Sequence, residues 1–396
     1  MLTKTPLLDA IDSANFSTAE ELIRNGERIP EGLQSYTLTQ LYETLIAKRG
    51  FAVLKALAAA GQIAMDVYEL EKFDNSVFKP LIKRLPLDEE SLTFLREFVA
   101  GAQNINDEVD GKTLLAYAFE SQAEPAVIKA LIAAGCRTDV KNNAEDNLIS
   151  QVVRINLMPE PKQLAYVEML IQEGVDVNET NVVKQTALHI AVERDKSHLV
   201  DILLQHGAQP NDQDKDGNSA YFYALAHKFD RVVYEKLSAN TPADFSLLNR
   251  NGQTPLSEFL RMMQGGASDT ALLEQLLVDG ADLDHATPYY NEPKSGWDWI
   301  IEKSTEVMQM ALQKTGTDIN HQDNNGNTLL HKVCAINPNY EQNKAREIYK
   351  KAKMLLDAGA DPTITNTQDK KPMDLAANDN LKAKTVEILL AAEKKL

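Results

Sequence analysis

Residues 185–211, QTALHIAVERDKSHLVDILLQHGAQPN, contain two short helical patterns that cannot be stable on their own. Thr186 is a good N-cap for the first pattern, because its hydroxyl can accept hydrogen bonds from first-turn amides. The second, over 198–205, places its leucines and valine on one face at helical spacing, and Gly207 then ends it. Isolated helices of this length are marginal in water. Each apolar face therefore needs a neighbouring copy to cover it.

The same two landmarks recur along the whole chain. The helix-start slot is found at Thr5, Thr39, Ser76, Thr113, Asp146, Thr186, Ser219, Thr254, Ser295, Thr328 and Lys371. From first to last these positions span 366 residues in ten steps, or 36.6 residues per step. The matching helix ends read LIRNG at Leu22, LIAAG at Leu131, LIQEG at Leu170, LLQHG at Leu203, LLVDG at Leu276 and LLDAG at Leu355. Two landmarks held in register this often indicate a repeat protein.

The segment at Thr186 resembles the ankyrin consensus, in which a TPLH-type helix start is followed by a V-x-x-L-L-x-x-G-A-x-x-N ending. The resemblance implies an all-α fold, an ankyrin-repeat solenoid of stacked helix-turn-helix units with short hairpin loops. We expect a single array over residues 1–396 with about eleven repeats. Residues 36–106 diverge most from the pattern, and residues 366–396 form a C-terminal capping repeat that ends in lysines.

The distance from the helix-start slot to the closing glycine indicates where most insertions lie. It is 21 residues in the unit at Thr186 but 28 at Asp146, 26 at Thr254 and 31 at Thr328. The extra residues are expected between the two helices of a repeat. They include helix breakers at Pro159, Pro161, Gly265, Gly266 and Pro338. One shorter insertion follows Gly280, in the hairpin that leads to Ser295.

The net charge of −17 excludes more than it identifies. A nucleic-acid binder needs a basic field to neutralise phosphates, so we expect no nucleic acid and no anionic membrane as partner. The expected partner is another protein, and a basic face on it would be attracted to this chain. Many acidic proteins are acidic only for solubility, and that interpretation stays open.

Several features favour a cytoplasmic protein, and we expect it to be a monomer. No stretch approaches the ~18 apolar residues of a membrane helix. Asp9 and Asp12 lie where a signal peptide needs an apolar core. Cys136 and Cys334 have no partner at metal or redox spacing, which fits a reducing compartment. Export by a route without such a signal would leave no trace here.

One motif suggests metal chemistry. Residues 212–217, DQDKDG, copy the start of a calcium-binding EF-hand loop, but the twelfth position, where a bidentate acid is needed, is Tyr223. The alternative is a tight turn between two repeats, because such turns are rich in Asp, Asn and Gly. We favour the turn here and at the similar residues 323–326. No metal and no cofactor is expected.

The histidines and the missing motifs argue against an enzyme. His189 and His331 occupy the ankyrin TPLH slot, and the resemblance implies a structural role for them, in which the side chain ties neighbouring loops together. The other histidines share no metal-type spacing. No nucleophile elbow, P-loop or dinucleotide fingerprint is present, so no catalytic residue is expected.

The basic cluster at Lys344, Arg346, Lys350, Lys351 and Lys353 is interpreted as the solvated face of a lengthened helix. Contact with a phosphate or an acidic partner is the alternative.

The resemblance implies binding through the hairpin tips and the exposed sides of the first helices. The expected contact residues are Val182, Val183, Gln185, Glu193, Arg194, Lys215, Asp216, Asn218, Arg250, Asn251, Gln253, Tyr289 and Tyr290. Val182 and Val183 are apolar where tips are usually polar, and Tyr residues are frequent interface anchors. Tyr221 and Trp297 fall in a buried slot of the repeat and are expected in the core.

We therefore expect a non-catalytic protein-interaction scaffold or adaptor that binds a protein through its concave groove and tips. One alternative is an inhibitor or immunity-type protein that blocks a toxin or enzyme. Another is a metal-binding or enzymatic protein hidden in the divergent repeats.

Overall fold

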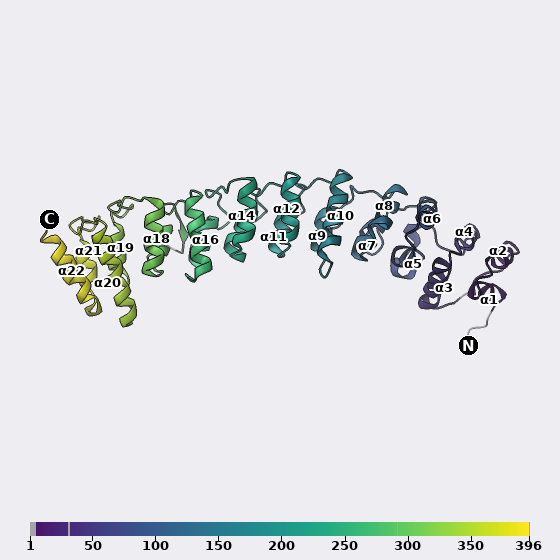
Figure 1. The fold of residues 1–396 in the computed structure, drawn as a ribbon, viewed down its shortest axis with the longest axis horizontal. Coiled ribbons are helices and arrows are strands. Elements are labelled where there is room, and N and C mark those ends of the chain that lie inside the picture. The colour runs from purple at the N-terminus through teal and green to yellow at the C-terminus, as the bar shows by residue number, and fades with distance from the viewer. Residues whose placement is uncertain (1–4, 31, 291, 396) are drawn as a thin grey trace. The chain divides into compact units, whose positions relative to one another are not determined.

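The structure is a computed structural model that describes residues 5–30, 32–290 and 292–395. It divides into two compact units, Met1–Gln209 and Pro210–Leu396. Within each unit, short antiparallel helices form pairs, and successive pairs stack side by side (Figure 1). The expectation of one uninterrupted array stays a prediction.

The first unit contains six helix pairs within its described residues. They are α1 (Pro6–Asp12) with α2 (Phe16–Arg24), α3 (Ser35–Ala47) with α4 (Phe51–Ala59), α5 (Phe78–Arg84) with α6 (Glu89–Ala100), α7 (Leu114–Glu120) with α8 (Pro125–Ala133), α9 (Leu148–Arg154) with α10 (Glu160–Gln172), and α11 (Ala187–Glu193) with α12 (Ser197–Gln205). Two 3₁₀ turns, η1 (Val67–Glu69) and η2 (Phe73–Asn75), lie in the divergent part.

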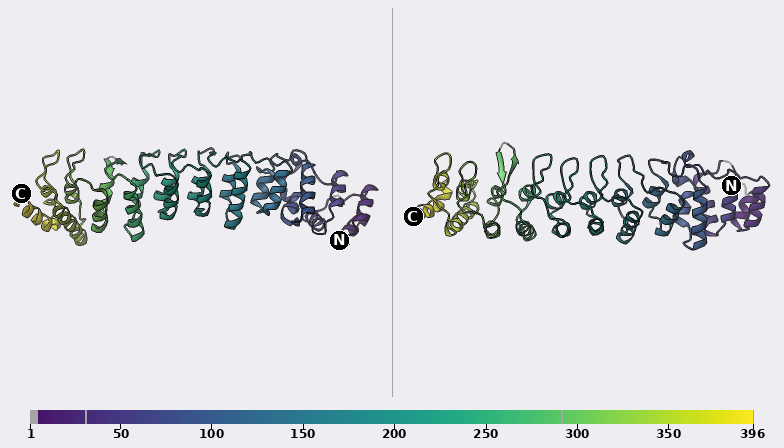
Figure 2. Two further views of the ribbon diagram at one scale, coloured as in Figure 1. Left: turned by 45° about the horizontal axis from the view of Figure 1, so that its top comes forward. Right: turned by 90° about the horizontal axis from the view of Figure 1, so that it is seen from above.

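The second unit contains five helix pairs within its described residues. They are α13 (Ala220–Phe222) and the π-helical η3 (Tyr223–Lys228) with α14 (Arg231–Asn240), α15 (Pro255–Met262) with α16 (Ala267–Val278), α17 (Gly296–Ile300) with α18 (Thr305–Thr315), α19 (Leu329–Ala335) with α20 (Gln342–Asp357), and α21 (Pro372–Ala376) with η4 (Asn380–Lys382) and α22 (Ala383–Glu393). Strands β1 (Ala286–Tyr289) and β2 (Glu292–Ser295) form an antiparallel hairpin, with Ala286 opposite Ser295. Figure 2 shows this hairpin among the loops on one side of the unit.

Most helix-start slots are N-caps, as the sequence predicts. Thr186 accepts a hydrogen bond from the backbone of His189, and Thr113, Thr254 and Thr328 act in the same way. The prediction is wrong at Thr39, which lies inside α3, where its hydroxyl bonds to the carbonyl of Ser35. At Ser76 and Asp146 it misses by one residue, because Val77 and Asn147 are the N-caps. Serine, threonine, aspartate and asparagine can all cap a helix, so a diverged repeat offers several candidates.

The insertions differ in part from the expectation. Residues 263–266 and 336–341 do lie between helices. Pro161, however, lies in the first turn of α10, where the missing N–H of proline is tolerated. Much of the extra sequence lengthens second helices, so that α10 has 13 residues and α20 has 16.

The core runs between the helices of each unit. The helix faces that meet there carry fully buried leucine, valine and aromatic side chains, including Leu203 in α12 and Phe259 in α15. Tyr221 and Trp297 are 1% and 2% exposed, which confirms that both belong to the core. Helices of seven to nine residues are too short to be stable alone, and here the neighbouring helices cover their apolar faces.

Asparagine side chains tie neighbouring repeats together. Asn178 donates to the carbonyl of Gly207 at 2.9 Å and accepts from the amide of Gln209 at 3.1 Å. Asn106, Asn211 and Asn320 each make the same pair of hydrogen bonds to backbone groups of the next repeat. These asparagines occupy the N of the G-A-x-x-N ending or its equivalent. The recurring asparagine in the sequence is therefore an inter-repeat connector.

Lysines cap the first helices of the preceding repeats. In each case Nζ donates to a carbonyl at or near a helix C-terminus, in the pairs Lys48 with Asp12, Lys162 with Gln122, Lys303 with Met263, Lys351 with Ile301 and Lys382 with Cys334. A cation is favourable there because the last carbonyls carry partial negative charge. Lys351 is only 3% exposed, and burial lowers its pKa. The interpretation of the α20 cluster as a solvated face is therefore wrong for Lys351.

Gly217 provides a test of how the loops between repeats are held. Its φ is +78°, and an added Cβ would lie 2.8 Å from Cα of Asn249 in the next repeat. We expect Gly217→Ala to destabilise the second unit by at least about 1 kcal/mol, because alanine is disfavoured at positive φ and the backbones must separate. Gly266→Ala is the control, since nothing lies within 4 Å of its added Cβ. Urea unfolding measures both; equal stability of the two variants would contradict the close packing of the loops.

Candidate binding surface

The loops between repeats are built on one recurring turn. An Asn or Asp side chain accepts from the backbone amides two and four residues later, which is an Asx turn. The residues that do so are Asn142, Asn181, Asp214, Asn249, Asp323 and Asn366. We call the residues enclosed by each such turn a tip. Both ends of a tip are fixed by backbone hydrogen bonds, so its enclosed residues point outward from a rigid frame.

Asp214 explains the resemblance of residues 212–217 to a calcium loop. One carboxylate oxygen accepts from the amides of Asp216 and Asn218, both at 2.9 Å, and the other accepts from the Tyr223 hydroxyl at 2.6 Å. Asp214 is 7% exposed, so its oxygens are already engaged in the turn. Tyr223, at the twelfth position, donates to this carboxylate. Within the described residues, no three or more His, Cys, Asp or Glu side chains are grouped to hold a metal ion.

The tip at Asn181 in the first unit exposes two apolar side chains. Val182 is 51% exposed and Val183 is 40% exposed, while the amide of Val182 donates to Ala144 of the preceding tip at 3.0 Å. Glu193 and Arg194, at the end of α11, are exposed as well. These four side chains are available to a partner on a surface that hydrogen bonds hold in place.

Gln185, which closes this turn, differs from the residues on the tip. It is 9% exposed, its Oε1 accepts from Arg154 at 3.3 Å, and its Nε2 donates to Glu193 at 3.2 Å. The side chain thus lies between two repeats, where it can position Glu193 but offers little surface of its own. The sequence pattern could not distinguish the two roles, because both need a polar residue directly before the N-cap.

Two tips of the second unit enclose a groove of about 530 Å³. Lys215 and Asp216 are exposed on the first tip, as are Arg250 and Asn251 on the second, whereas Asn218 and Gln253 are half-buried. The amide of Arg250 donates to the carbonyl of Asp216 at 2.7 Å, which joins the tips. Six of the expected contact residues therefore come together on one surface.

A π-helical turn forms one wall of this groove. In η3 the chain makes a wider turn than an α-helix, and the amide of Asp230 bonds back to the carbonyl of Ala224. His227 is exposed there, with its ring edge-on to Phe222 at 5.5 Å and to Tyr223 at 5.2 Å. Single π turns are frequent at functional sites. No sequence signal indicated the π turn, because the residues around it fit an ordinary helix.

The β1–β2 hairpin replaces the tip in the repeat that follows. Tyr290 lies at its turn, 91% exposed and with a φ of +49°. Tyr289 is half-buried: its ring packs edge-on against Tyr290 at 4.7 Å and Trp299 at 4.8 Å. Lys294 Nζ lies 4.1 Å from the centre of the Trp299 ring. Tyr289 is thus part of a packed aromatic cluster, and Tyr290 is its exposed end.

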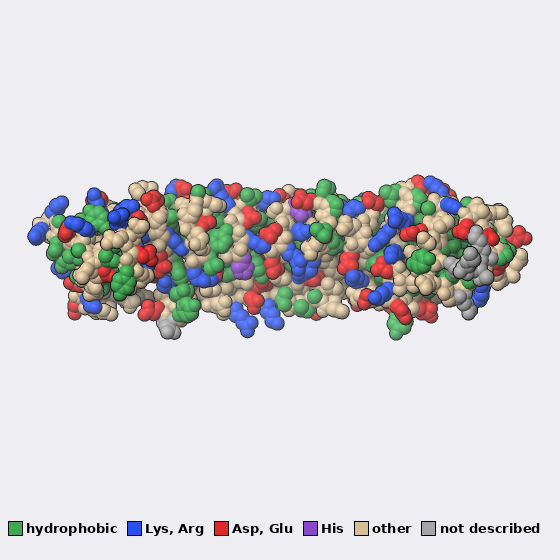
Figure 3. Space-filling model, turned by 90° about the horizontal axis from the view of Figure 1, so that it is seen from below, with side chains coloured by type: hydrophobic (Ala, Val, Ile, Leu, Met, Phe, Trp, Pro, Cys, Tyr) green, Lys and Arg blue, Asp and Glu red, His purple; other side chains and the backbone are tan. Residues whose placement is uncertain are grey.

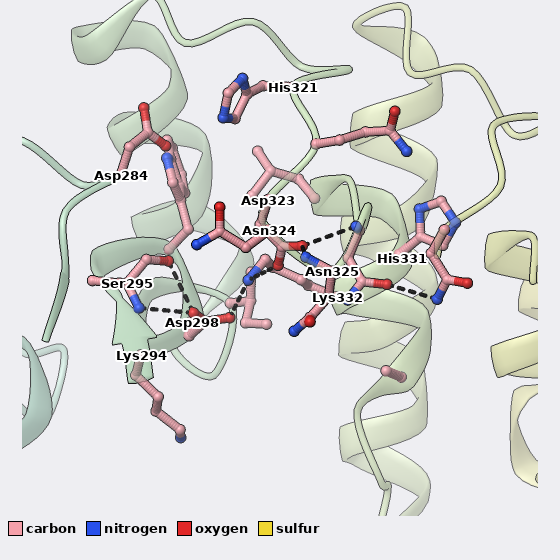
Figure 4. Close-up of a pocket in the computed structure, with 18 of the residues that line it drawn as sticks. Asp284, Lys294, Ser295, Asp298, His321, Asp323, Asn324, Asn325, His331 and Lys332 are labelled. Atoms are coloured by element: carbon pink, nitrogen blue, oxygen red, sulfur yellow. Dashed lines mark hydrogen bonds and ion pairs between the residues drawn. The ribbon is translucent and has the colours of Figure 1, made fainter. Parts of the chain in front are cut away.

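A second groove of about 610 Å³ lies between the hairpin and the repeats after it. We call it the acidic groove, because its lining includes Asp284, Glu292, Asp298, Asp318 and Asp323. Lys332 lies across its floor and binds Asp298 at 2.6 Å and Asp323 at 2.8 Å (Figure 4). No pattern in the sequence indicates this groove, because its residues are spread over three repeats.

The charges in the acidic groove stabilise each other. Burial alone would lower the pKa of Lys332, but hydrogen bonds to Asp298 and Asp323 outweigh it and raise the pKa. For Asp323, burial acts to raise the pKa, and the hydrogen bond from Lys332 with the turn amides lowers it below its usual value. Both groups are therefore charged at neutral pH. On the face drawn in Figure 3, by contrast, acidic and basic side chains are mixed.

His189 and His331 lie in equivalent positions at the start of α11 and α19. In each, Nδ1 accepts from the amide of the capping threonine, at 3.2 Å from Thr186 and 3.1 Å from Thr328. His331 Nε2 lies 3.1 Å from the carbonyl of Lys370 in the following tip. Burial lowers the pKa of His331 despite this contact. The geometry is that of a neutral imidazole connecting a helix start to a loop.

Comparisons with known proteins identify the repeat. Residues 160–238 match a family model of ankyrin repeats in three copies, and residues 300–342 match a model of ankyrin repeats in many copies. The helices and capping geometry agree with these matches. The expected all-α ankyrin fold is confirmed.

Several known proteins are similar in sequence to parts of this chain. The B-cell lymphoma 3 protein homolog of Mus musculus is 27% identical over 60% of this chain and 49% of its own length. NF-kappa-B inhibitor delta of Mus musculus is 25% identical over 48% of this chain and 62% of its own length. Ankyrin repeat and SOCS box protein 6 of Homo sapiens is 30% identical over 30% of this chain and 29% of its own length. The chain thus spans about half the length of the first relative and less of several others.

Among solved structures, the ankyrin repeat domain of Bcl-3 aligns with a TM-score of 0.48 and 23% identity. That alignment covers 61% of this chain and 98% of the Bcl-3 chain.

The ion pair of Asp323 with Lys332 leads to a pH prediction. Because the folded pKa of Asp323 is lowered, its stabilisation is present above the unfolded value and is lost as pH falls through the folded value. We expect Asp323→Asn, which keeps the turn acceptor, to destabilise the second unit by about 1 kcal/mol at pH 7. The difference from wild type should shrink at pH 3 in urea unfolding. In a Lys332→Met background the substitution should have little effect, and a pH-independent difference would show that the ion pair is not its source.

Proposed function

Because residues 160–238 and 300–342 are ankyrin repeats, we propose that this chain is a non-catalytic scaffold or adaptor that binds another protein through its tips and first helices. One observation carries the proposal: apolar side chains stand exposed on rigid turns, with Val182 and Val183 in the first unit and Tyr290 in the second. Exposed apolar side chains on a pre-organised frame bind with little further loss of entropy.

Two further observations support a role in binding rather than catalysis. Burial raises the pKa of Cys136 and Cys334 to about 12, so neither thiol is available as a nucleophile at neutral pH. The exposed His227 packs edge-on against the rings of Phe222 and Tyr223, which gives it a place in the aromatic packing of the turn. The proposal includes a cytoplasmic location. None of the helices in the described residues is long and apolar enough to cross a membrane.

Blocking a target is the second candidate function. The net charge of −17 and the five carboxylates of the acidic groove favour a basic target. One relative, moreover, is named as an inhibitor of NF-kappa-B. A blocked target would lose its own activity when it is bound, which a scaffolded partner would not.

Tyr290 and Tyr340 form a matched pair for testing the surface. They are 91% and 96% exposed, and both have positive φ, but Tyr290 lies on the hairpin and Tyr340 in the loop between α19 and α20. We expect Tyr290→Asn to weaken partner binding by about fivefold or more, because exposed tyrosines at interfaces often contribute over 1 kcal/mol. Asparagine tolerates positive φ, so thermal unfolding should not change in either variant.

The partner is first obtained by affinity purification from the native host and then titrated against the purified chains. Tyr340→Asn should bind like wild type. A photo-crosslinking residue at position 290 should capture the partner, and one at position 340 should not. If Tyr290→Asn binds normally and only position 340 crosslinks, the proposed surface is wrong. If no protein is captured by the wild-type chain, the proposed function itself is wrong.

A further inference from the structure

The acidic groove contains a buried hydrogen-bond donor without a partner. Trp297 lines the groove and is 2% exposed, and its indole Nε1 has no hydrogen-bond partner among the described residues. A buried N–H that has lost water and gained no acceptor is destabilising, and such groups are rare in native proteins. Its position beside a groove suggests that an acceptor comes from a ligand.

The charge of the groove is also incomplete. Lys332 forms ion pairs with Asp298 and Asp323. Lys294 donates to Glu302 at 3.2 Å, and Glu302 does not line the groove. Asp284, Glu292 and Asp318 form no ion pair within the described residues, and Asp284 and Asp318 are exposed at the groove. In Figure 4 Asp284 stands away from the paired Asp298 and Lys332. The groove therefore has carboxylates available for cations from outside.

We propose that the acidic groove binds an extended polypeptide segment of a partner that carries lysine or arginine side chains. The cationic side chains would pair with Asp284, Glu292 and Asp318, and a backbone carbonyl would accept from Trp297 Nε1. This inference rests on the proposed function and adds to it the chemistry of the bound segment.

Other ligands satisfy only part of the site. A polyamine offers cations but no acceptor for the indole N–H. A phosphate-bearing chain offers acceptors, but its charge is repelled by the carboxylates. A helix with basic side chains uses most of its carbonyls internally, whereas an extended segment leaves them free. The combination of an orphan donor with unpaired carboxylates thus selects an extended basic peptide.

The chain provides its own reporter for this groove. Its two tryptophans are Trp297 and Trp299, so intrinsic tryptophan fluorescence comes only from this region. In a Trp299→Phe chain, Trp297 is the single source of the signal. A new hydrogen bond from its N–H should shift the emission when a ligand enters, and the shift should saturate with the binding isotherm.

The experiment titrates the full chain with acetyl-(Lys-Ser)₅-amide, acetyl-(Glu-Ser)₅-amide and spermine, by calorimetry and by fluorescence in the Trp299→Phe background. We expect the lysine peptide to bind and to shift the Trp297 emission. The glutamate peptide should not bind, and spermine should bind more weakly and leave the emission unchanged. Affinity for the lysine peptide should fall with added salt.

Variants separate the two features of the site. Trp297→Phe keeps an aromatic ring but removes the donor, so we expect affinity for the lysine peptide to fall about fivefold. The smaller ring also leaves a cavity in the core, so thermal unfolding is measured to show that the variant is folded at the temperature of the titration. The double variant Asp284→Asn with Asp318→Asn should weaken binding by about fivefold as well. Asp357→Asn is the charge control: Asp357 is exposed on α20 outside the groove. It should bind like wild type.

Each contrary result would overturn a specific part of the proposal. Equal binding of spermine and the lysine peptide would show that no carbonyl is recognised, and the peptide assignment would be wrong. Normal affinity in both the Trp297→Phe and the double variant would place binding elsewhere. If the lysine peptide does not bind but the wild-type chain still captures its partner through Tyr290, the groove proposal alone is wrong. If no partner is captured, the proposed function fails independently of the peptide.

Discussion

The hydrogen bonds that each repeat makes with the next are the constraint on which this structure depends. Helices of seven to nine residues do not persist alone, and asparagines in the segments that follow the second helices bind backbone groups one repeat further on. Asn320, for example, donates to Gly359 and accepts from Asp361, at 3.2 and 2.8 Å. The apolar faces supply the driving force, but these bonds set the register in which the faces meet. The tips are equally fixed, because the amide of Arg250 bonds to Asp216.

These hydrogen bonds between repeats explain why a binding surface can form on loops. Loop residues usually lose entropy on binding, whereas a tip that is enclosed by an Asx turn and closed by backbone hydrogen bonds has already lost it. Side chains such as Val182 and Val183 can therefore be exposed without collapsing onto the core, and at Tyr290 the β1–β2 hairpin provides the frame instead. The acidic groove depends on the same frame, since Asp323 both closes a turn and binds Lys332. One residue thus links the geometry of the loop to the charge of the site.

The sequence predicts what is local and periodic. Thr186, His189 and Gly207 follow the helix-start and helix-end pattern, so their structural settings could be inferred from spacing and resemblance. It does not predict contacts that depend on a neighbouring repeat. Gln185 and Lys351 look like surface residues by type, yet partners from other repeats bury them. The π turn at Tyr223–Lys228 and the orphan Trp297 N–H have no signal in residue type or period at all, because they arise from packing.

Native-state amide hydrogen exchange in an Asn320→Ala chain tests this dependence on neighbouring repeats most directly. We predict that the amide of Asp361 loses protection, together with amides at the adjoining ends of α18 and α20. Protection in α14, which lies more than one repeat away, should stay unchanged. Unchanged exchange at Asp361 would show that the asparagine does not hold the neighbouring repeat. A uniform loss of protection throughout the second unit would show that its stability is not built from nearest-neighbour contacts.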